Sequence, residues 1–285
     1  MTKPLTNLSY IKELSEKYGF TFEKKFGQNF IVNPSVCPRI CEHAEVDENT
    51  GVIEIGVGVG VLTSELARNA AKVVTIEIDT TLKPLLEETL AEFDNIKIIF
   101  DDVLNVDLNK LIKEEFGDMR VVVCANLPYY ITSPIIMKLL EDRLPVDNIT
   151  VMVQKEAAQR LCAAEKSREI GAISLAVQYY AVPKVCFNVS PGSFYPAPKV
   201  TSSVIRLDVK KENEINPANE RNMFRLIRAA FTQRRKTFVN SVSSTLGMPK
   251  ADIEAALTEI GENPMVRPEK LSLAQFSRLS DILIK

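Results

Sequence analysis

The stretch VIEIGVGVGVLT, residues 52–63, indicates how this chain folds. Its first four residues form the apolar run of a buried strand, three glycines follow, and a helical pattern begins at Val61. Glycine allows a sharp backbone turn and lets a ligand approach the main chain closely. A strand, a glycine-rich turn and a helix in this order are typical of α/β proteins with a ligand site at the turn.

Four further β-rich runs alternate with helical patterns, namely Val73–Ile76, Ile96–Phe100, Val121–Cys124 and Ile149–Val153. This alternation predicts a doubly wound α/β sheet of the Rossmann-like type. Two later runs, Val185–Val189 and Ser203–Val209, flank a Pro-rich loop. We expect them to form an antiparallel hairpin at the edge of the sheet.

The polar stretch Lys210–Glu220 is typical of a linker. Beyond it, helical periodicity runs through Arg221–Thr245, Lys250–Ile260 and Leu271–Ile284. We therefore predict an α/β domain over residues 1–210 and a small C-terminal all-α domain over residues 211–285.

The bulk composition is that of an ordinary soluble protein, with 285 residues, 46% of them hydrophobic and 25% charged. No apolar run has the length of a membrane span, and the first twenty residues lack the apolar core of a signal peptide. We therefore expect no membrane association and a cytoplasmic location.

The cysteines do not indicate a metal site. They are five in number and scattered, which is typical of reduced, buried thiols. Cys37, Cys41 and His43 lie close in sequence, but no fourth ligand follows at a recognisable spacing, so we predict no bound metal. His43 is also the only histidine, which excludes most hydrolytic arrangements that need an imidazole, unless His43 itself is the base.

The glycine spacing does not fit dinucleotide binding, because G-x-G-x-x-G would require glycine where Val61 stands. Glu54, just before the turn, suits instead the cationic amino group or sulfonium of S-adenosylmethionine. Glu77 ends the second strand, where an acid grips ribose hydroxyls through both oxygens. Asp102, after the third strand, can accept a hydrogen bond from the cofactor's adenine amine. Taken separately, such acids are also typical of solvated strand ends.

The fourth strand ends in Asn126-Leu127-Pro128-Tyr129. The lone pair of an adenine N6 amine is delocalised into the ring, so its methylation needs acceptors that hold both N–H groups. The Asn126 side-chain oxygen and the Leu127 carbonyl can supply them. Pro128 fixes the backbone direction, and Tyr129 offers a ring on which an unstacked base can lie. Alone, the same tetrapeptide is ordinary turn chemistry.

Taken together, these motifs resemble the KsgA/RsmA family of ribosomal RNA adenine N6,N6-dimethyltransferases over nearly the whole chain. The resemblance extends to KKFGQNFI at 24–31, QKE at 154–156, GAIS at 171–174, FYPAPKV at 194–200 and FTQRRKT at 231–237. It implies that residues 1–45 cover the cofactor. The residues it implies for cofactor binding, together with those argued above, are Gln28, Asn29, Ile31, Glu54, Gly56, Gly58, Glu77, Asp102 and Asn126.

The resemblance also implies an activity: methyl transfer from S-adenosylmethionine to two adjacent adenosines near the 3′ end of 16S rRNA, with a role in ribosome biogenesis. Phe194 would cover the face of the base opposite Tyr129, although a buried loop anchor is an equal reading. Two positions depart from the family pattern: Val57 replaces a usual Pro, and Asp101 a usual Gly. Either departure bears on cofactor affinity.

Positive charge is concentrated in the last part of the chain. Residues 200–285 hold 14 Lys and Arg against 10 Asp and Glu, although the whole chain has a net charge of -2. In a helix, Arg221, Arg225, Arg228 and Arg235 would share one face. Such a face is often merely solvated, but repeated cations also suit phosphate contacts. We predict rRNA contacts from this face, and further ones from Lys24, Lys25, Arg234 and Lys236.

Three other functions remain open at this point. A large-subunit rRNA dimethyltransferase of the antibiotic-resistance type would share the cofactor residues and the Asn-x-Pro-Tyr clamp. A non-catalytic ribosome assembly factor or transcription factor could retain the fold, although Glu77, Asp102 and Asn126 are intact. A DNA adenine methyltransferase would need a base-reading domain, for which no segment is evident. The small ribosomal subunit is the expected partner, and a monomer the expected state.

Overall fold

A computed structural model describes residues 4–19, 29–233 and 235–284. The chain divides into two compact units. The sheet unit comprises residues 1–158 and 183–209, and the helical unit residues 159–182 and 210–285. One junction lies at the predicted boundary near residue 210. Residues 159–182, which the sequence analysis assigns to the α/β domain, are grouped with the C-terminal helices instead.

Seven strands form the main sheet of the described chain, in the order β4-β3-β2-β5-β6-β9-β7. The first five are mutually parallel, β9 runs antiparallel to β6, and β7 lies at the edge. All seven predicted runs are therefore confirmed as strands. Their bounds are β2 Thr50–Ile55, β3 Lys72–Glu77, β4 Ile96–Phe100, β5 Arg120–Asn126, β6 Asn148–Gln154, β7 Ala181–Val189 and β9 Ser202–Val209.

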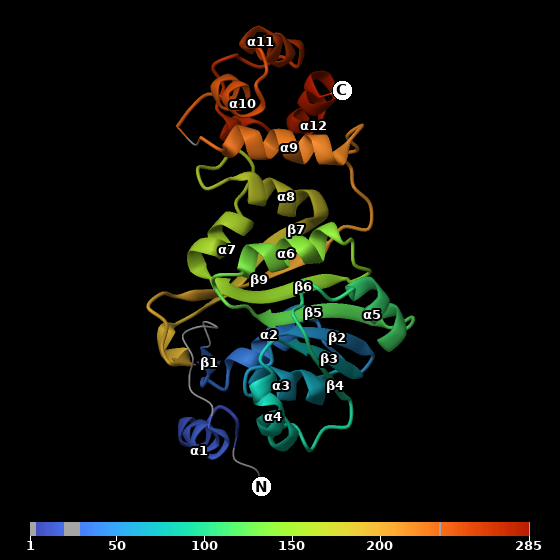
Figure 1. The fold of residues 1–285 in the computed structure, drawn as a ribbon, viewed down its shortest axis with the longest axis vertical. Coiled ribbons are helices and arrows are strands. Elements are labelled where there is room, and N and C mark those ends of the chain that lie inside the picture. Colours follow the sequence, from blue (N-terminus) through green and yellow to red (C-terminus); the bar gives the residue numbers. More distant parts are fainter. Residues whose placement is uncertain (1–3, 20–28, 234, 285) are drawn as a thin grey trace. The chain divides into compact units, whose positions relative to one another are not determined.

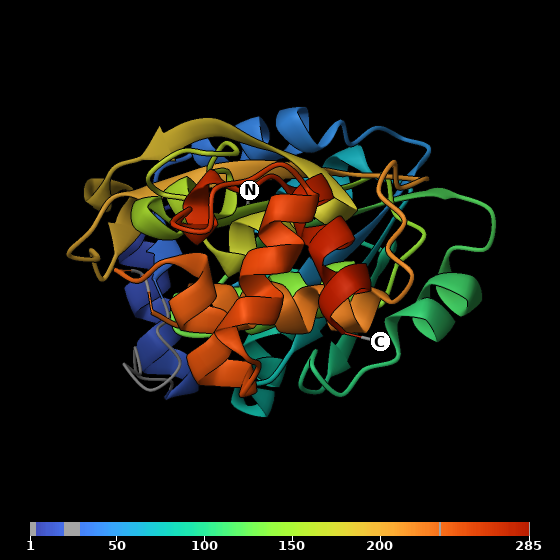
Figure 2. The same cartoon turned by 90° about the horizontal axis from the view of Figure 1, so that it is seen from above.

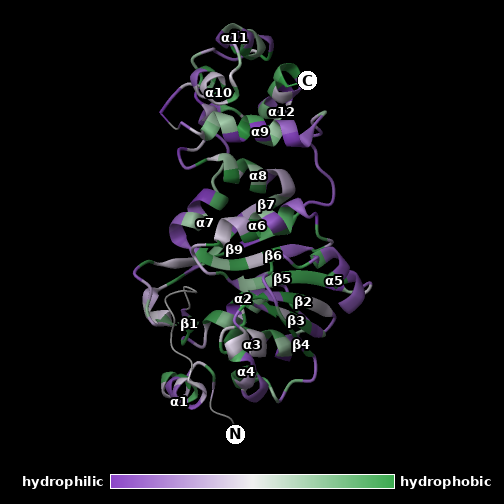
Figure 3. Cartoon of the chain, viewed as in Figure 1, coloured by the Kyte–Doolittle hydropathy of each residue, from purple (hydrophilic) through white to green (hydrophobic). Residues whose placement is uncertain are grey.

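Helices cover both faces of this sheet (Figure 1). On one face, α2 (Val36–Ala44), α3 (Val61–Asn69) and α4 (Lys83–Thr89) share a buried apolar cluster with alternate strand residues such as Val52 and Cys124. The central strands accordingly carry mostly hydrophobic colours in Figure 3. Because successive strand residues point to opposite faces, the two faces have separate sets of buried side chains.

Two further helices, α5 (Leu108–Glu115) and α6 (Thr132–Glu141), connect the parallel strands β4, β5 and β6. The Asn109 side chain in α5 donates a hydrogen bond of 2.8 Å to the Asp142 carbonyl at the end of α6, which ties the start of α5 to the end of α6. Crossover helices of this kind are what parallel pairing requires.

The N-terminal part of the chain packs beside the glycine-rich turn. Helix α1 (Leu8–Tyr18) is tied to α4, because the side chains of Lys17 and Tyr18 both donate to the Glu88 carboxylate. The short strand β1 (Phe30–Ile31) pairs antiparallel with β8 (Phe194–Tyr195). Two segments far apart in sequence thus meet next to the carboxyl end of the sheet.

The helical unit has its own core, in which Phe276 contacts Phe231 and Phe238. Viewed from above, its helices cross one another (Figure 2). Helix α7, Lys155–Leu161, spans the junction of the two units. The other helices of the unit are α8 Ala172–Tyr180, α9 Glu220–Phe231, α10 Phe238–Leu246, α11 Lys250–Glu259 and α12 Leu273–Leu283.

The predicted helix over 221–245 is wrong in one respect: it is two helices. Helix α9 ends at Phe231, and Thr237 begins α10 as its N-cap, with its side chain accepting from the backbone N–H of Asn240 at 3.4 Å. A polar run separates the two helices, and the phenylalanines on either side of it, Phe231 and Phe238, both pack on Phe276. No helix in the described part of the chain is long and apolar enough to span a membrane.

Candidate active site

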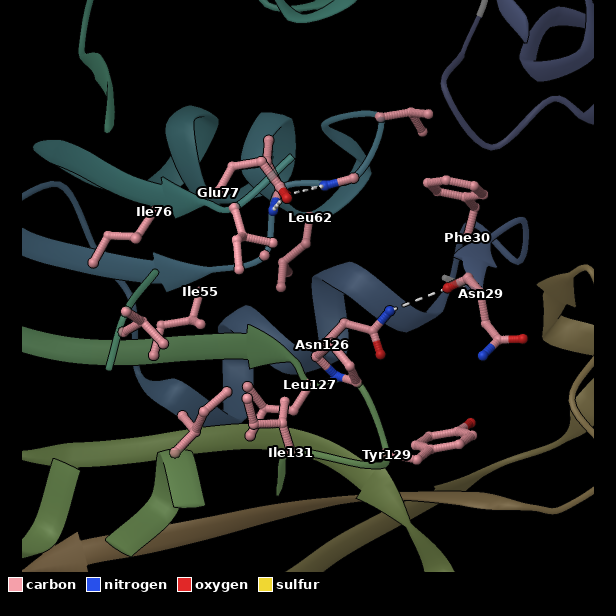
Figure 4. Close-up of a pocket in the computed structure, with 18 of the residues that line it drawn as sticks. Asn29, Phe30, Ile55, Leu62, Ile76, Glu77, Asn126, Leu127, Tyr129 and Ile131 are labelled. Atoms are coloured by element: carbon pink, nitrogen blue, oxygen red, sulfur yellow. Dashed lines mark hydrogen bonds between the residues drawn. The ribbon is translucent and has the colours of Figure 1, made fainter. Parts of the chain in front are cut away.

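The carboxyl ends of β2, β3, β4 and β5 open into one cavity (Figure 4). Parallel neighbours end at the same edge of a sheet, which is where ligands bind in open α/β folds. The cavity brings together most of the predicted catalytic and cofactor-binding residues, namely Asn29, Ile31, Gly56, Gly58, Glu77, Asp102, Asn126, Leu127, Pro128 and Tyr129. Four other predicted positions, Gln28, Lys24, Lys25 and Arg234, lie outside the described residues.

The Glu77 carboxylate binds the glycine-rich turn through backbone hydrogen bonds. Its Oε2 atom accepts the backbone N–H groups of Val57 at 2.8 Å and Gly58 at 3.2 Å, while Oε1 accepts that of Asp79 at 2.9 Å. A carboxylate offers about four acceptor sites, so roughly one remains, on Oε1. The turn occupies Oε2, so a ribose hydroxyl that binds Glu77 would have to bind Oε1, and the expected contact through both oxygens does not fit.

The backbone N–H of Val57 donates one of these hydrogen bonds to Glu77. Proline, which the family pattern has at this position, carries no N–H and could not donate to Glu77. Burial raises the pKa of Glu77 above its usual value, and the amides of Asp79, Gly58 and Val57 oppose that rise. The departure noted in the sequence thus acts directly on the carboxylate at the cofactor cavity.

The glycines of the turn are required by its backbone. Gly56 and Gly58 have φ values of +81° and +58°, which side-chain-bearing residues rarely adopt. A Cβ atom on Gly58 would lie 3.1 Å from the ring of Phe30, so β1 packs directly over the turn. A Cβ on Gly56 would meet only the Asn126 carbonyl, at 3.9 Å, which leaves this side of the turn open to a ligand.

Asp102, predicted to accept from an adenine amine, lies just after the end of β4 in the cavity wall. Its Oδ1 atom accepts the backbone N–H of Leu104 at 2.9 Å, which fixes the carboxylate in a turn and leaves Oδ2 as the acceptor for an amine. Apolar side chains that sequence reasoning missed complete the walls here: Ile78 and Val103, each directly after a predicted acid. Their position next to the acids at two strand ends is the signal that could have identified them.

Asn126 is oriented by the N-terminal segment. Its Nδ2 donates a hydrogen bond of 3.2 Å to the carbonyl of Asn29, as Figure 4 shows. With the amide nitrogen engaged in this way, the Oδ1 atom on the other branch is left as an acceptor. The predicted acceptor role of Asn126 thus has a structural cause outside its own strand.

The rest of the tetrapeptide is equally constrained. The Pro128 carbonyl is occupied, because it accepts from the Ile131 backbone N–H at 3.2 Å and from the Thr132 hydroxyl at 3.1 Å. The Leu127 carbonyl accepts no hydrogen bond from the described residues, so it is the one free for a ligand. The Tyr129 hydroxyl lies 2.7 Å from Ser202 Oγ, which holds the ring at the cavity. Burial raises the pKa of Tyr129, so the phenol stays protonated.

Glu54 does not line the cavity, and its predicted contact with the cofactor is not supported by the structure. Its side chain is fully buried, on the face covered by α2 and α3, whereas its neighbour Ile55 lines the cavity. Alternation along the strand is the reason. Burial raises the pKa of Glu54 to about 8. The nearby hydroxyl groups of Thr63 and Thr75 oppose this rise in the Glu54 pKa. Neither hydroxyl forms a hydrogen bond with the Glu54 carboxylate.

Phe194 also differs from its predicted role. It is only 3% exposed, belongs to the core cluster beneath β1 and β8, and does not line the cavity. Pairing of Ile31 with Phe194 makes it the anchor of the Pro-rich loop. In this structure Tyr129, and not Phe194, presents a ring to the cavity.

The predicted RNA-binding cations lie in the helical unit. Arg221, Arg225 and Arg228 are exposed along one face of α9, and the buried Phe224 and Ile227 lie on an adjacent face. Arg235 and Lys236 are exposed as well but belong to the segment between α9 and α10, so Arg235 does not share the helical face. None of these five cations forms an ion pair with another described residue. Among described residues, no cluster of His, Cys, Asp and Glu could hold a metal ion.

A Rossmann-like sheet, a glycine turn backed by an acid and an Asn-Leu-Pro-Tyr clamp define an S-adenosylmethionine-dependent methyltransferase acting on an amino nitrogen. The structure is similar to a dimethyladenosine transferase from Plasmodium falciparum, with a TM-score of 0.70 and 26% identity over 88% of this chain and 95% of that one. It is also similar to the 23S rRNA methyltransferase ErmE, with a TM-score of 0.68 and 26% identity over 90% and 100% of the two chains.

Sequence comparison is more specific. The family described as "Ribosomal RNA adenine dimethylase" matches residues 19–285. Two relatives named "Ribosomal RNA small subunit methyltransferase A" are 47% identical, from Lachnoclostridium phytofermentans, and 46% identical, from Bacillus pumilus. The match to the first relative covers 95% of this chain and 94% of the relative. The match to the second covers 100% of this chain and 99% of the relative. The chain belongs to the ribosomal RNA adenine dimethylase family, and the predicted resemblance is confirmed.

The cavity fits the methyl donor of this family, S-adenosylmethionine. Glu77 retains an acceptor for a ribose hydroxyl, Asp102 retains one for the adenine amine, and Ile78 and Val103 offer apolar walls for the ring. The open side of Gly56 provides a close approach to the main chain. The described residues thus offer acceptors for the ribose and the adenine amine and an apolar wall for the adenine ring.

We expect cofactor binding to depend on pH through Glu77, since a protonated carboxyl group loses acceptor capacity. Binding should weaken as pH falls through the pKa of Glu77. The Val57→Pro variant lacks one amide that lowers this pKa, so its midpoint should lie at higher pH than that of the wild type. Calorimetric titration of S-adenosylmethionine across pH 4 to 8 measures both midpoints.

The reference for this comparison is Glu77→Gln, which cannot titrate and should bind weakly with no midpoint. An unchanged or lower midpoint in Val57→Pro would contradict the role assigned to the Val57 amide.

Glu54 should make folding stability fall with rising pH. Its folded pKa of about 8 lies above the usual value of 4.5, so between these values the folded state keeps a proton that the unfolded state releases. Glu54→Gln removes this effect. Its free energy of unfolding, relative to wild type, should therefore rise by about 1 kcal/mol per pH unit between pH 5 and 8. Urea denaturation at several pH values tests this; a pH-independent difference would contradict it.

Proposed function

We propose that this protein transfers methyl groups from S-adenosylmethionine to the N6 atoms of two adjacent adenosines near the 3′ end of 16S rRNA during small-subunit assembly. The relatives named for small-subunit methylation match at 47% and 46% identity over almost their full lengths. The observation in the structure that carries the proposal is the clamp at the end of β5, where the Asn126 oxygen and the Leu127 carbonyl remain as acceptors beside a held tyrosine ring.

The two acceptors account for the chemistry required of the protein. Together they can accept both N–H groups of an adenine amine and draw its nitrogen toward tetrahedral geometry, which makes its lone pair available. Tyr129 gives the extruded base a stacking surface in place of its neighbours in the RNA. S-adenosylmethionine, when bound, supplies the electrophilic methyl group.

No general base is needed. The amine nitrogen becomes acidic once it is alkylated and can release its proton to water. The cavity holds no histidine, since the only one, His43, lies on α2 with its ring 5.4 Å from that of Phe187. Tyr129 is also unsuited as a base because its pKa is raised. The first transfer leaves one N–H on the amine, which permits a second.

The exposed cations of the helical unit support contact with an RNA backbone. Arg221, Arg225 and Arg228 recur along one face of α9, and phosphate contacts require such repeated cations. The proposal places the chain on the small ribosomal subunit and therefore in the cytoplasm. That it acts as a monomer stays a prediction.

The large-subunit alternative is favoured only by the fold shared with ErmE. That likeness is at 26% identity, whereas the relatives named for the small subunit are at 46% and 47%. A non-catalytic assembly factor would not need to keep the Asn126 amide oriented and Glu77 bound to the turn. These observations favour an active small-subunit enzyme.

The decisive experiment measures transfer of labelled methyl groups to small ribosomal subunits that lack the modification, with the modified positions mapped. Wild-type protein should label two adjacent adenosines. Asn126→Ala should lower the rate constant about a hundredfold or more, in line with the loss of one hydrogen-bonding group aimed at the transition state. Binding of S-adenosylmethionine, followed by calorimetry, should change far less.

Labelling of large-subunit RNA alone would assign the chain to the antibiotic-resistance type. No labelling of any RNA, with S-adenosylmethionine still bound, would favour the assembly factor. Equal rates for wild type and Asn126→Ala would refute the clamp.

The RNA face is tested by salt dependence. Replacing Arg225 and Arg228 by Gln should weaken binding to small subunits and reduce the slope of log affinity against log salt by about one for each arginine that binds a phosphate. Arg68→Gln, an exposed arginine of the sheet unit paired with Glu92, is the matched control and should leave the slope unchanged. If the salt-dependence slope is the same for the wild type, the Arg225 and Arg228 variant and Arg68→Gln, then α9 does not contact the RNA.

A further inference from the structure

Tyr130 is an exposed ring at the mouth of the cavity. It lines the same cavity as Tyr129, yet 63% of its surface is exposed. Among the large apolar side chains that the structure describes as exposed, it is the only aromatic one. Its hydroxyl has no hydrogen-bond partner among the described residues. An exposed aromatic ring beside a cavity offers a face on which an unpaired base can stack.

The backbone beneath Tyr130 is nevertheless fixed. The Ile131 N–H donates to the Pro128 carbonyl at 3.2 Å, which closes a tight turn with Tyr129 and Tyr130 at its two central positions. Tyr129 is held in turn by Ser202. The two consecutive rings therefore start from a rigid turn, about 3.8 Å apart at their Cα atoms. One ring is held against the protein, and the other is directed to solvent.

We infer that Tyr130 is a stacking platform for the base next to the target adenosine. This inference rests on the proposed function and adds a second base-binding position to it. When one base leaves its stack, its neighbour loses a stacking partner, and an aromatic ring beside the cavity mouth replaces that partner. A purine neighbour gains most because its ring system is largest. Two adjacent adenosines meet this condition: each is the purine neighbour of the other.

The surroundings of Tyr130 suit a single RNA strand. Two exposed lysines, Lys155 and Lys199, lie on the chain segments beside Ser202, the partner of Tyr129. The Lys155 backbone N–H donates to the Thr201 carbonyl at 3.0 Å, which brings these segments together. Neither lysine forms an ion pair with another described residue. Exposed rings next to cations are how proteins hold unpaired nucleotides.

The test compares Tyr130→Ala, Tyr130→Leu and Tyr130→Phe in steady-state methylation of unmodified small subunits. Stacking requires a ring and not the hydroxyl. The Ala and Leu variants should therefore raise the KM for subunits about tenfold or more, and Phe should stay within about twofold of wild type. The dissociation constant for S-adenosylmethionine and the melting temperature should not move. Met119→Ala, a 45% exposed side chain at the opposite end of β5, is the control.

Several outcomes would overturn the platform. An unchanged KM in Tyr130→Ala would show that the ring touches no RNA. Weaker binding of S-adenosylmethionine would assign the ring to the cofactor, and a Phe variant as poor as Ala would assign the effect to the hydroxyl.

The proposed function and the platform are tested separately. The proposed function is tested by which RNA the wild-type protein methylates, and the platform by the ratio of the KM of each variant to that of the wild type. If wild-type protein methylates only large-subunit RNA, the same variants are compared on that RNA, and the same KM ratios decide on the platform. If wild-type protein methylates no RNA, both the proposed function and the role of Tyr130 as a stacking platform are wrong.

Discussion

The site depends on the hydrogen bonds between Glu77 and the glycine-rich turn. The turn follows β2, Glu77 ends β3, and parallel pairing of these neighbouring strands brings both to one edge. The carboxylate then accepts the amides of Val57 and Gly58 and defines the floor of the cofactor cavity. The carboxylate proposed to bind the ribose therefore also supports the positive-φ turn, and a change in the charge of Glu77 would alter both the proposed ligand contact and the support of the loop.

The sheet could be predicted from the sequence because each strand is a short apolar run between turn residues. Parallel strand ends share an edge, so the convergence of Glu77, Asp102 and Asn126 followed from the same pattern. Glu54 shows the limit of this reasoning. Alternation separates Glu54 from Ile55, but only the packing of α2 and α3 decides that the Glu54 side chain lies under these helices and the Ile55 side chain at the cavity. The acid that is closest to the glycines in sequence therefore does not line the cavity.

Features that depend on contacts between distant segments were not predictable in this way. Phe194 is buried because β8 pairs with β1, across more than 160 residues of sequence. The break between α9 and α10 has a similar origin, since Phe231 and Phe238 both pack on Phe276 of α12. A helical period fits residues 221–245 locally. Tertiary packing overrides it, so Arg235 leaves the face shared by the other arginines.

The Asn29–Phe30 segment links the two halves of the chemistry. The Asn29 carbonyl accepts from the Asn126 amide, and the Phe30 ring packs over Gly58 in the cofactor turn. Under the proposed function, the group that would orient the target amine and the loop that would hold the methyl donor are thus contacted by consecutive residues. Displacement of β1 would release the Asn126 side chain and uncover the turn together. A methyl transferase needs both at the same time, because an oriented amine without a donor, or a donor without an oriented amine, achieves nothing.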